Sequence, residues 1–440
     1  MGESCRVLCI AAVIVAKADS THDEGRKKTS PMRVLYVHER FGALGGAEAN
    51  AVIIAGELKA KGHEVGLLHG PRTGKSEERW ERVFDWKRLL NEGANAAFSV
   101  RDALREFRPD VIYVHKMADL RVIEALVNSG VPLVRMVHDH DIYCMRSYKY
   151  FYRTREICTR AASAYCIFGC GAFIARNHGD GFPLKYVSYF DKKREIALNR
   201  QFDRMIVVTP FMRAELLKNG FDPEKVEIHP PVPRAGDPNL RSSFSDRNLI
   251  IYAGQIIRGK GVDVLLESLA LVKSNFECII LGDGSHRAYC EELSKKLGIS
   301  DRVKFQGFVP QEQLKDYYRE CSVVVLSSVW PEPIATVGLE VMRYGLPVVA
   351  FDAGGIKDWL IDRVNGFLVP WMDRPAYAEA IDKLLQDKNL ARDMGQRGLM
   401  IVSDKYNFDH YIDGLEDLFE RVITKRNPKA PKPEVALASA

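Results

Sequence analysis

The sequence predicts an α/β protein with two Rossmann-like, doubly wound parallel-sheet domains that face each other across a cleft. Three observations support this prediction. The length of 440 residues fits two domains of roughly 200 residues each. Short apolar runs alternate with segments of helical period, and one polar break rich in Pro and Ser divides them into two series. Open parallel sheets bind ligands at the carboxyl ends of their strands, so we expect functional residues there.

The first domain is expected over residues 32–235. An apolar run at 33–38 indicates a buried strand, and a Gly-rich loop and a helix from about Gly46 to Lys61 follow it. One stripe of that helix is apolar, as a core-facing helix requires: Ala47, Ala51, Ile54, Ala55 and Leu58. Further strands are expected at 64–69, 110–115, 132–137 and 204–209.

A linker is expected at 236–247 and a second domain at 248–405. A C-terminal helix at 406–424 and a disordered Pro/Ala/Lys-rich tail at 425–440 follow. The alternation of strands and helices predicts parallel sheets with right-handed crossovers. The strands of the second domain are expected at 248–254, 276–282, 322–328, 346–351 and 366–370.

Residues 1–31 lie outside the predicted fold. Arg6, an apolar run at 7–16 and the small-residue motif at 16–18 imitate a secretory signal. A strand begins directly after Met32, however, which favours an over-extended start with Met32 as the working start. Both interpretations stay open.

Composition excludes several classes of protein. The chain is 46% hydrophobic and 28% charged, and it contains no apolar run of about 18 residues that could span a bilayer. The net charge of +5 suits an acidic small molecule or an anionic membrane surface rather than nucleic acid. Nine unevenly spaced cysteines indicate a reducing compartment. We therefore expect a cytoplasmic protein and leave contact with the inner face of the membrane open.

The segment Gly70–Ser76 resembles a phosphate-binding P-loop. Only three residues separate Gly70 from Gly74, whereas that motif requires four. No separate acidic strand offers a magnesium ligand. We interpret the segment as a turn.

A second Gly-rich loop follows the first strand. Gly42, Gly45 and Gly46 allow the backbone to approach a ligand closely, and the helix N-terminus supplies free N–H groups. Tight packing is an equally weighted alternative. The loop lacks the G-x-G-x-x-G pattern, and no clear acidic residue follows the second strand, which disfavours a dinucleotide site.

Charged residues at two places in the second domain suit a nucleotide sugar. Arg258 and Lys260 lie between a strand and a helix, where cations could neutralise a diphosphate without a metal. For Arg258 a solvated basic loop is the alternative. Glu332 follows an apolar strand, and Glu340 lies eight residues later in the next helix. Their carboxylates could accept hydrogen bonds from vicinal hydroxyls, one pair on a sugar and one on a ribose.

On these motifs, most of 246–400 resembles the nucleotide-sugar half of family 4 glycosyltransferases, the retaining enzymes of GT-B fold. Residues 303–318 resemble that family's base-binding segment. In the first domain the resemblance is confined to the Gly45-Gly46 loop and to His138 of the stretch VHDHD. The family's motifs appear here as Lys260-Gly261, Gly282-Asp283-Gly284, Glu332 with Glu340, Gly345–Val349 and Gly354-Gly355.

The resemblance implies a role for each matching residue. Lys260 would hold the diphosphate, Glu340 the ribose hydroxyls and Glu332 the hydroxyls of the transferred sugar. The backbone near Val309 would meet the base.

In the first domain, the resemblance implies that Gly45 and Gly46 admit the diphosphate and the reacting sugar. His138 would hydrogen-bond that sugar near its anomeric centre. The catalytic set would thus be His138, Glu332 and Lys260.

The sequence departs from the family's pattern in three places. Gln255 stands where the family has Arg, which leaves Arg258 as a substitute. The family's E-G-F-G is Glu332-Pro333-Ile334-Ala335 here, so the identity of the sugar is open. Pro230-Pro231 replaces an Asn-Gly before the linker.

The resemblance implies transfer of a sugar from a nucleotide-sugar donor to a saccharide or lipid-linked acceptor with retention, in polysaccharide or glycolipid synthesis. No cofactor is expected, because Lys260 and the dipoles of helices that we expect to open at Gly46 and Gly355 would supply fixed positive potential where negative charge develops. A non-catalytic nucleotide-sugar-binding subunit and a GT-B nucleotide-sugar epimerase are the alternatives.

Two motifs raise the question of a metal, although none is expected in the GT-B reading. Asp139-His140-Asp141 matches a D-x-D metal motif, a match that is frequent by chance. Four cysteines within 27 residues allow a structural zinc site, with free thiols as the favoured alternative. They are Cys144, Cys158, Cys166 and Cys170.

The basic-aromatic stretch at 147–155 could line an acceptor groove or touch lipid headgroups, and an exposed loop is the equally weighted alternative.

Overall fold

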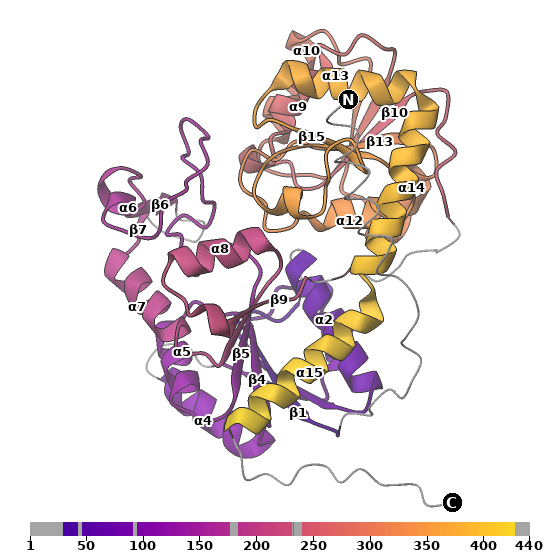
Figure 1. The fold of residues 1–440 in the computed structure, drawn as a ribbon. Coiled ribbons are helices and arrows are strands. Elements are labelled where there is room, and N and C mark those ends of the chain that lie inside the picture. The colour runs from indigo at the N-terminus through magenta and orange to yellow at the C-terminus, as the bar shows by residue number, and fades with distance from the viewer. Residues whose placement is uncertain are drawn as a thin grey trace, which may run out of the picture. The chain divides into compact units, whose positions relative to one another are not determined.

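The computed structural model describes residues 30–42, 46–90, 95–176, 184–230, 232 and 240–426. Gly45, almost all of the leader at 1–31, nearly all of the predicted tail and part of the linker therefore lie outside the described residues. Two parallel sheets with interspersed helices account for most of the described residues (Figure 1). The prediction of two parallel-sheet α/β domains is confirmed.

The first sheet has seven parallel strands in the order β3-β2-β1-β4-β5-β8-β9. Because β1 is central and the order runs outward from it in both directions, the sheet is doubly wound. Its strands are β1 Arg33–His38, β2 Glu64–His69, β3 Trp86–Leu89, β4 Val111–Lys116, β5 Leu133–Val137, β8 Arg204–Val207 and β9 Val226–Ile228. Its helices are α2 Gly46–Ala60, α3 Glu77–Val83, α4 Ala96–Phe107, α5 Leu120–Val127, α7 Tyr189–Asn199 and α8 Pro210–Lys218.

The second sheet has six parallel strands in the order β12-β11-β10-β13-β14-β15. Its strands are β10 Leu249–Ala253, β11 Glu277–Leu281, β12 Val303–Gly307, β13 Cys321–Leu326, β14 Val348–Phe351 and β15 Gly366–Val369. Its helices are α9 Val262–Leu269, α10 Arg287–Lys296, α11 Gln311–Tyr318, α12 Thr336–Met342, α13 Arg374–Gln386 and α14 Lys388–Lys405.

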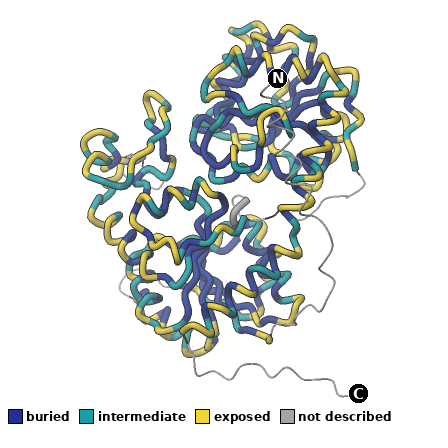
Figure 2. The backbone as a smooth tube through the Cα atoms, in the orientation of Figure 1, coloured by how far each residue is buried: buried dark blue, intermediate teal, exposed yellow. Residues whose placement is uncertain are grey.

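The core lies along the strands of both sheets, which Figure 2 shows as buried. β5 and β13 are buried at every position, because strands covered on both faces lose their exposed side. The apolar stripe predicted for α2 is buried at Ala51, Ile54 and Leu58. Amphipathic packing of this kind, rather than local propensity, stabilises the helix.

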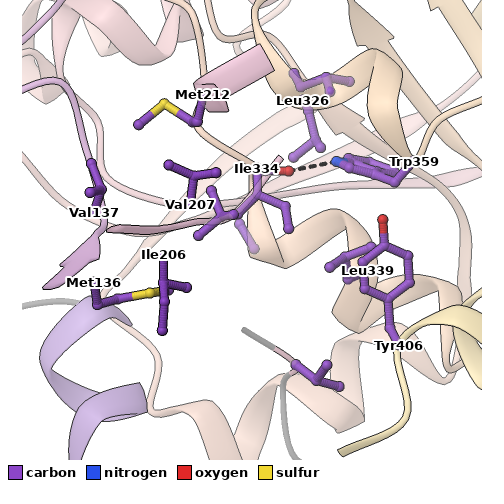
Figure 3. Close-up of a cluster of buried hydrophobic side chains, with 14 of the residues drawn as sticks. Met136, Val137, Ile206, Val207, Met212, Leu326, Ile334, Leu339, Trp359 and Tyr406 are labelled. Carbon is purple, nitrogen blue, oxygen red and sulfur yellow. Dashed lines mark hydrogen bonds between the residues drawn. The ribbon is translucent and has the colours of Figure 1, made fainter. Parts of the chain in front are cut away.

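One buried apolar cluster joins side chains from both sheets (Figure 3). Ile334 lies among the side chains of this cluster, and its carbonyl accepts a hydrogen bond from Trp359 Nε1 at 2.5 Å. First-domain members of the cluster include Met136, Val207 and Met212. Ile334 lies two residues after Glu332, so it anchors the loop that carries Glu332 in the core.

The last helix, α15 (Phe408–Arg426), packs on the first domain. Its Phe419 ring lies 5.2 Å from the ring of Tyr113 on β4. Its buried Glu416 accepts hydrogen bonds from Lys61 and pairs with His63 Nε2 at 2.6 Å. Figure 1 shows α15 beside α2. The C-terminal helix thus completes the first domain, although it follows the second in sequence.

An excursion of the first domain separates β5 from α7. It contains the short helix α6 (Tyr165–Phe168) and an antiparallel two-stranded ribbon, β6 (Ile174–Arg176) with β7 (Leu184–Tyr186). The sequence pattern did not predict this ribbon, since both strands are only three residues long. Across the described part of the chain, no helix is both long and apolar enough to span a membrane.

Candidate donor site

Lys260 ends a short 3₁₀ helix, η3 (Arg258–Lys260), between β10 and α9. The next residue, Gly261, has a φ of +66°, and a Cβ there would lie 2.0 Å from the carbonyl oxygen of Ser327. Any other residue would clash with that backbone. This close approach places the Lys260 side chain next to the segment that follows β13. The Lys-Gly pair therefore has a packing reason in addition to its charge.

Glu332 is the partner of Lys260. The Nζ atom of Lys260 lies 2.6 Å from Oε1 of Glu332, which is only 4% exposed. The same oxygen accepts hydrogen bonds from Trp330 Nε1 at 2.8 Å and from the Ser328 hydroxyl. Burial raises the pKa of the Glu332 carboxyl, but the Lys260 charge and these hydrogen bonds outweigh burial and hold the pKa below its ordinary value. The carboxylate is therefore ionised at neutral pH.

The two carboxylate oxygens of Glu332 differ. Oε1 takes all three donors, whereas Oε2 accepts no hydrogen bond from any residue that the structure describes. An ionised carboxylate oxygen without a protein donor is a strong acceptor for a ligand hydroxyl. The indole of Trp330 also lies beneath Lys260 Nζ, 5.2 Å from ring centroid to nitrogen.

A double-glycine turn holds the backbone of Glu332. The Glu332 amide donates to the carbonyl of Ala353 at 3.1 Å, and the Gly355 amide donates to the carbonyl of Glu332 at 2.7 Å. A Cβ on Gly355 would lie 2.2 Å from the carbonyl oxygen of Pro333, so a side chain there would push this turn away. The glycines therefore position the carboxylate.

The helix that we expected to open at Gly355 is absent from the structure. Only a 3₁₀ turn, η4 (Gly355–Asp358), begins there, and the Gly355 amide is already bound to the chain. One short turn has little dipole, and its first donor is occupied. The predicted contribution of this helix to the positive potential was wrong.

Glu340 lies on α12, and its side chain is mostly buried. Burial raises the pKa of its carboxyl to about 7. Within the described residues its carboxylate accepts no hydrogen bond and forms no ion pair, and Lys260 is bound by Glu332 instead. The group is thus a buried acid with no protein partner.

Three histidines lie at the ends of β1, β4 and β5. His115 Nδ1 lies 3.0 Å from His138 Nε2, and the two rings are stacked. Burial lowers the pKa of His138 to about 3 and that of His38 to about 4. Burial also lowers the pKa of His115 well below its ordinary value. His138 is therefore neutral and can act as a hydrogen-bond partner but not as a cation.

His138 has no hydrogen bond to Glu332 or Lys260; two neighbouring side chains make the connection instead. His140 Nε2 lies 2.8 Å from the carbonyl of Pro331, and the Thr209 hydroxyl donates to the carbonyl of Pro333 at 2.8 Å. The residues on both sides of Glu332 are thus held by the first domain.

Sequence reasoning missed His140 and Thr209 as site-supporting residues. Thr209 does carry a local signal, because Thr directly before a Pro at the first helical position is typical of an N-cap, and its hydroxyl accepts from the Met212 amide. Ser328 and Trp330 were also missed, although they lie only four and two residues before Glu332. Their role depends on side-chain direction, which spacing alone does not give.

The D-x-D carboxylates face a lysine. Lys116 Nζ lies 3.3 Å from Asp139 and 3.0 Å from Asp141. Burial lowers the pKa of Lys116, but the two aspartates outweigh burial and hold this pKa above its usual range. The carboxylates are therefore neutralised within the chain.

The four clustered cysteines are free and half-buried. Within the residues that the structure describes, no three His, Cys, Asp or Glu side chains form a group that could hold a metal ion. This arrangement gives no support to the zinc hypothesis.

Arg258 and Gln255 differ in their surroundings. The Arg258 guanidinium lies over the ring of Tyr152 at 4.7 Å, and Tyr148 stacks on Trp330 at 5.6 Å. The basic-aromatic stretch at 147–155 is thus partly packed against the donor-site residues. The Gln255 side chain is exposed, and Val309, after β12, is half-buried.

The remaining predicted glycines can be placed only in part. Gly46 begins α2, whereas Gly45 lies outside the described residues. In the P-loop-like segment the Gly74 amide donates to Glu77 at 2.7 Å, and the same carboxylate binds Arg72 at 2.8 Å. The chain's own carboxylate occupies the amide that a phosphate would need. This geometry agrees with the interpretation as a turn.

Two family models match the chain. Residues 44–232 match the model described as Glycosyltransferase Family 4, and residues 238–399 match the model described as Glycosyl transferases group 1. The two matches fall on the two sheets in turn.

Known proteins show the same likeness. An uncharacterised glycosyltransferase of Methanocaldococcus jannaschii is 28% identical over 55% of this chain and 63% of its own length. A D-inositol 3-phosphate glycosyltransferase of Xylanimonas cellulosilytica is 31% identical over 45% of this chain and 49% of its own length. The chain thus spans about half to two thirds of these relatives.

A solved structure shares the fold. The Anabaena protein HepE, crystallised with UDP-glucose, superposes with a TM-score of 0.67 at 20% identity, covering 88% of this chain and 99% of its own. At this identity the likeness concerns the fold alone.

Proposed function

The chain belongs to the family 4 glycosyltransferases of GT-B fold, and on this premise we propose that it transfers a sugar from a nucleotide-sugar donor to a saccharide or lipid-linked acceptor with retention. The observation that carries the proposal is the ion pair at 2.6 Å between half-buried Lys260 and buried Glu332. It offers one cation and one ionised acceptor at the carboxyl end of β13, where a parallel sheet binds its ligand.

Lys260 is proposed to bind the donor diphosphate. Its ammonium donates one hydrogen bond to Glu332, and its two other N–H groups could donate to phosphate oxygens. Negative charge grows on the diphosphate as the sugar departs. A fixed ammonium in a buried site stabilises that charge without a metal or cofactor.

Glu332 and Glu340 are proposed to bind hydroxyls. The open Oε2 atom of Glu332 would accept from the transferred sugar, while Lys260, Ser328 and Trp330 hold the other oxygen. Glu340 would accept from the ribose, and the backbone near Val309 would meet the base. Gly45 and Gly46 would admit the diphosphate, and Gln255 and Arg258 would lie at the edge of the site.

Retention is proposed to follow from attack on the face that the diphosphate leaves. The bond between the anomeric carbon and the phosphate oxygen breaks, and its electron pair goes to that oxygen. The acceptor hydroxyl attacks the same face and passes its proton to the departing phosphate oxygen. Neutral His138, whose pKa of about 3 keeps it uncharged, would hydrogen-bond the sugar near the reacting carbon.

The first donors to test are uridine diphosphate sugars, because HepE was crystallised with UDP-glucose. The proposed acceptors are intermediates of polysaccharide or glycolipid synthesis on the cytoplasmic side of the membrane.

A donor screen tests the proposal. Purified protein is incubated with UDP-, GDP-, ADP- and dTDP-sugars, and released nucleoside diphosphate is measured with and without simple acceptors. We expect release with one donor and its loss in Lys260→Ala. Binding of a donor without release would favour a non-catalytic subunit, a reading that Gln255 and the Pro333-Ile334 loop keep open. Conversion of the donor sugar without release would favour an epimerase.

A further inference from the structure

Exposed apolar side chains concentrate in the excursion of the first domain. Nine of the 17 large apolar residues that are exposed among the described residues lie between 148 and 190. Single exposed apolar residues are normal on a soluble protein, but contiguous groups mark an interaction surface. Six of the nine form what we name the aromatic patch: Phe168, Phe173, Ile174, Leu184, Tyr186 and Phe190.

The β6–β7 ribbon forms the centre of the aromatic patch. Ile174 is paired with Tyr186 across the ribbon, and Leu184 lies two residues from Tyr186. These three side chains therefore share one face, since alternate residues of a strand point the same way. Phe173, which directly precedes β6, is also exposed. An isolated two-stranded ribbon is marginally stable in water, so an exposed apolar one favours a partner.

The elements on both sides extend the patch. Phe168, at the end of α6, is 86% exposed, and Phe190, in the first turn of α7, is 77% exposed. Lys193 and Arg194 lie one turn after Phe190 and so share its side of α7. Figure 1 shows α6 and the ribbon next to each other beyond α7, and Figure 2 shows the same elements mostly exposed.

The patch lies within a strongly basic segment. Residues 146–194 contain ten Lys and Arg against three Asp and Glu, a net charge of +7, whereas the whole chain carries +5. The rest of the chain is therefore slightly acidic. Four of these cations are exposed and make no ion pair with any described residue: Arg153, Arg160, Lys185 and Lys193.

We propose that the aromatic patch docks this protein on an anionic membrane surface. Phe, Tyr and Leu side chains would enter the headgroup region, and Lys185 and Lys193 would lie over lipid phosphates, as in other interfacial surfaces of basic and aromatic composition. A second copy of the chain is a poorer occupant, because a symmetric contact would bring two segments of charge +7 together. The surface is separate from the Lys260–Glu332 pair, so the proposal does not depend on the transferase reaction.

Vesicle sedimentation of the full chain tests this proposal. We expect the protein to sediment with vesicles of phosphatidylcholine and phosphatidylglycerol, less with phosphatidylcholine alone, and less as salt rises. The variant Phe168→Ser/Tyr186→Ser/Phe190→Ser should lower the partition coefficient about tenfold or more, because it removes three of the six apolar side chains that would enter the headgroup region. Lys185→Glu/Lys193→Glu should lower binding to anionic vesicles by a similar factor.

Matched controls carry the same chemical changes elsewhere. Phe98→Ser/Leu271→Ser/Met400→Ser replaces three exposed apolar residues outside the patch, and Lys296→Glu/Lys405→Glu reverses two exposed lysines. Both should bind vesicles as the parent does. The single variant Phe168→Ser tests the most exposed position of the patch by the same sedimentation assay. It leaves the residues of the ribbon unchanged.

Three outcomes would overturn the proposal. They are no sedimentation of the parent with anionic vesicles, an equal loss in the controls, or a parent dimer that the Phe168→Ser/Tyr186→Ser/Phe190→Ser variant converts to a monomer by light scattering. Thermal unfolding and donor binding of each variant should match the parent. Since sedimentation needs no donor, an inactive transferase would leave the result intact.

Discussion

Lys260 Nζ lies 2.6 Å from Glu332 Oε1, although the two residues are 72 positions apart in the chain. The pair leaves one carboxylate oxygen of Glu332 open and places the ammonium over the ring of Trp330. The pairing offsets part of the desolvation cost of burying Glu332, because Lys260, Ser328 and Trp330 all donate to its charged oxygen. The pair is thus both a structural element and the centre of the proposed donor site.

Lys260→Ala should abolish the proposed reaction and weaken the fold. We expect nucleoside diphosphate release to fall by about 100-fold or more, because a fixed cation on the leaving group is lost. The free energy of unfolding should fall by roughly 1–3 kcal/mol, since buried Glu332 loses its cation. Lys357→Ala, an exposed lysine next to the Gly354-Gly355 turn, is the control and should change neither. Normal release by Lys260→Ala would remove this residue from the site.

Glu340 should make donor binding depend on pH. Its pKa is about 7 because of burial, and the ionised carboxylate is a stronger acceptor for the ribose hydroxyls than the protonated acid. The ionised fraction then rises about tenfold between pH 6 and pH 8, and UDP-glucose affinity measured by calorimetry should rise by a similar factor. Glu340→Gln should remove this dependence, and Glu340→Ala should weaken binding by about 1–3 kcal/mol at pH 8.

The same carboxyl should affect stability in the opposite direction. A raised pKa means that the folded chain holds this proton more tightly than the unfolded chain, so stability falls as pH rises from about 4.5 through 7. Glu340→Gln should therefore unfold at a higher temperature than the parent at pH 8. An unchanged pH dependence in this variant would show that another group is responsible.

Thr209→Val should loosen the loop that carries Glu332. The substitution keeps the shape of the side chain but removes the hydroxyl that binds the Pro333 carbonyl and caps α8. We expect a loss of roughly 1–2 kcal/mol of stability and weaker donor binding. Thr209→Ser retains the hydroxyl and should behave as the parent in thermal unfolding and calorimetry. Equal behaviour of both variants would argue against a role for this hydroxyl.

Glu416→Ala should detach the last helix from the first domain. Glu416 is buried and binds both His63 and Lys61, so its removal takes this partner from buried His63 and leaves Lys61 with Asp413. Loss of a buried hydrogen-bond partner costs about 1–3 kcal/mol. Asp417→Ala, on the exposed side of the same helix, should cost little. Chemical denaturation of the two variants measures the difference, and equal midpoints would contradict the assignment.

The fold could be predicted because buried parallel strands are short, continuous and apolar. The runs at 33–38 and 322–328 correspond to β1 and β13 within a residue or two. β3 escaped prediction because Trp86–Leu89 is a half-exposed edge strand with two charged residues. The expected helix at Gly355 failed because the turn is held by a distant backbone contact with Glu332, not by a local helical pattern.

The site residues stay predictions. Motif spacing and the family resemblance single out Lys260, Glu332 and Glu340, and the structure shows that Lys260 pairs with Glu332 and that burial raises the pKa of Glu340. The support from His140 could not be predicted, since its partner Pro331 is 191 positions away. No periodicity or spacing connects residues so far apart.

The sequence by itself determined the two alternating series of strands and helices and the order of the charged motifs along them. These features depend on neighbouring residues, whose polarity repeats with the period of a strand or a helix. Only the tertiary structure decided that Lys260 pairs with Glu332, that α15 returns to the first domain through His63 and Glu416, and that the aromatic patch stays exposed. Each of these depends on the packing of distant segments, because burial and electrostatic pairing are set by distance in space and not along the chain.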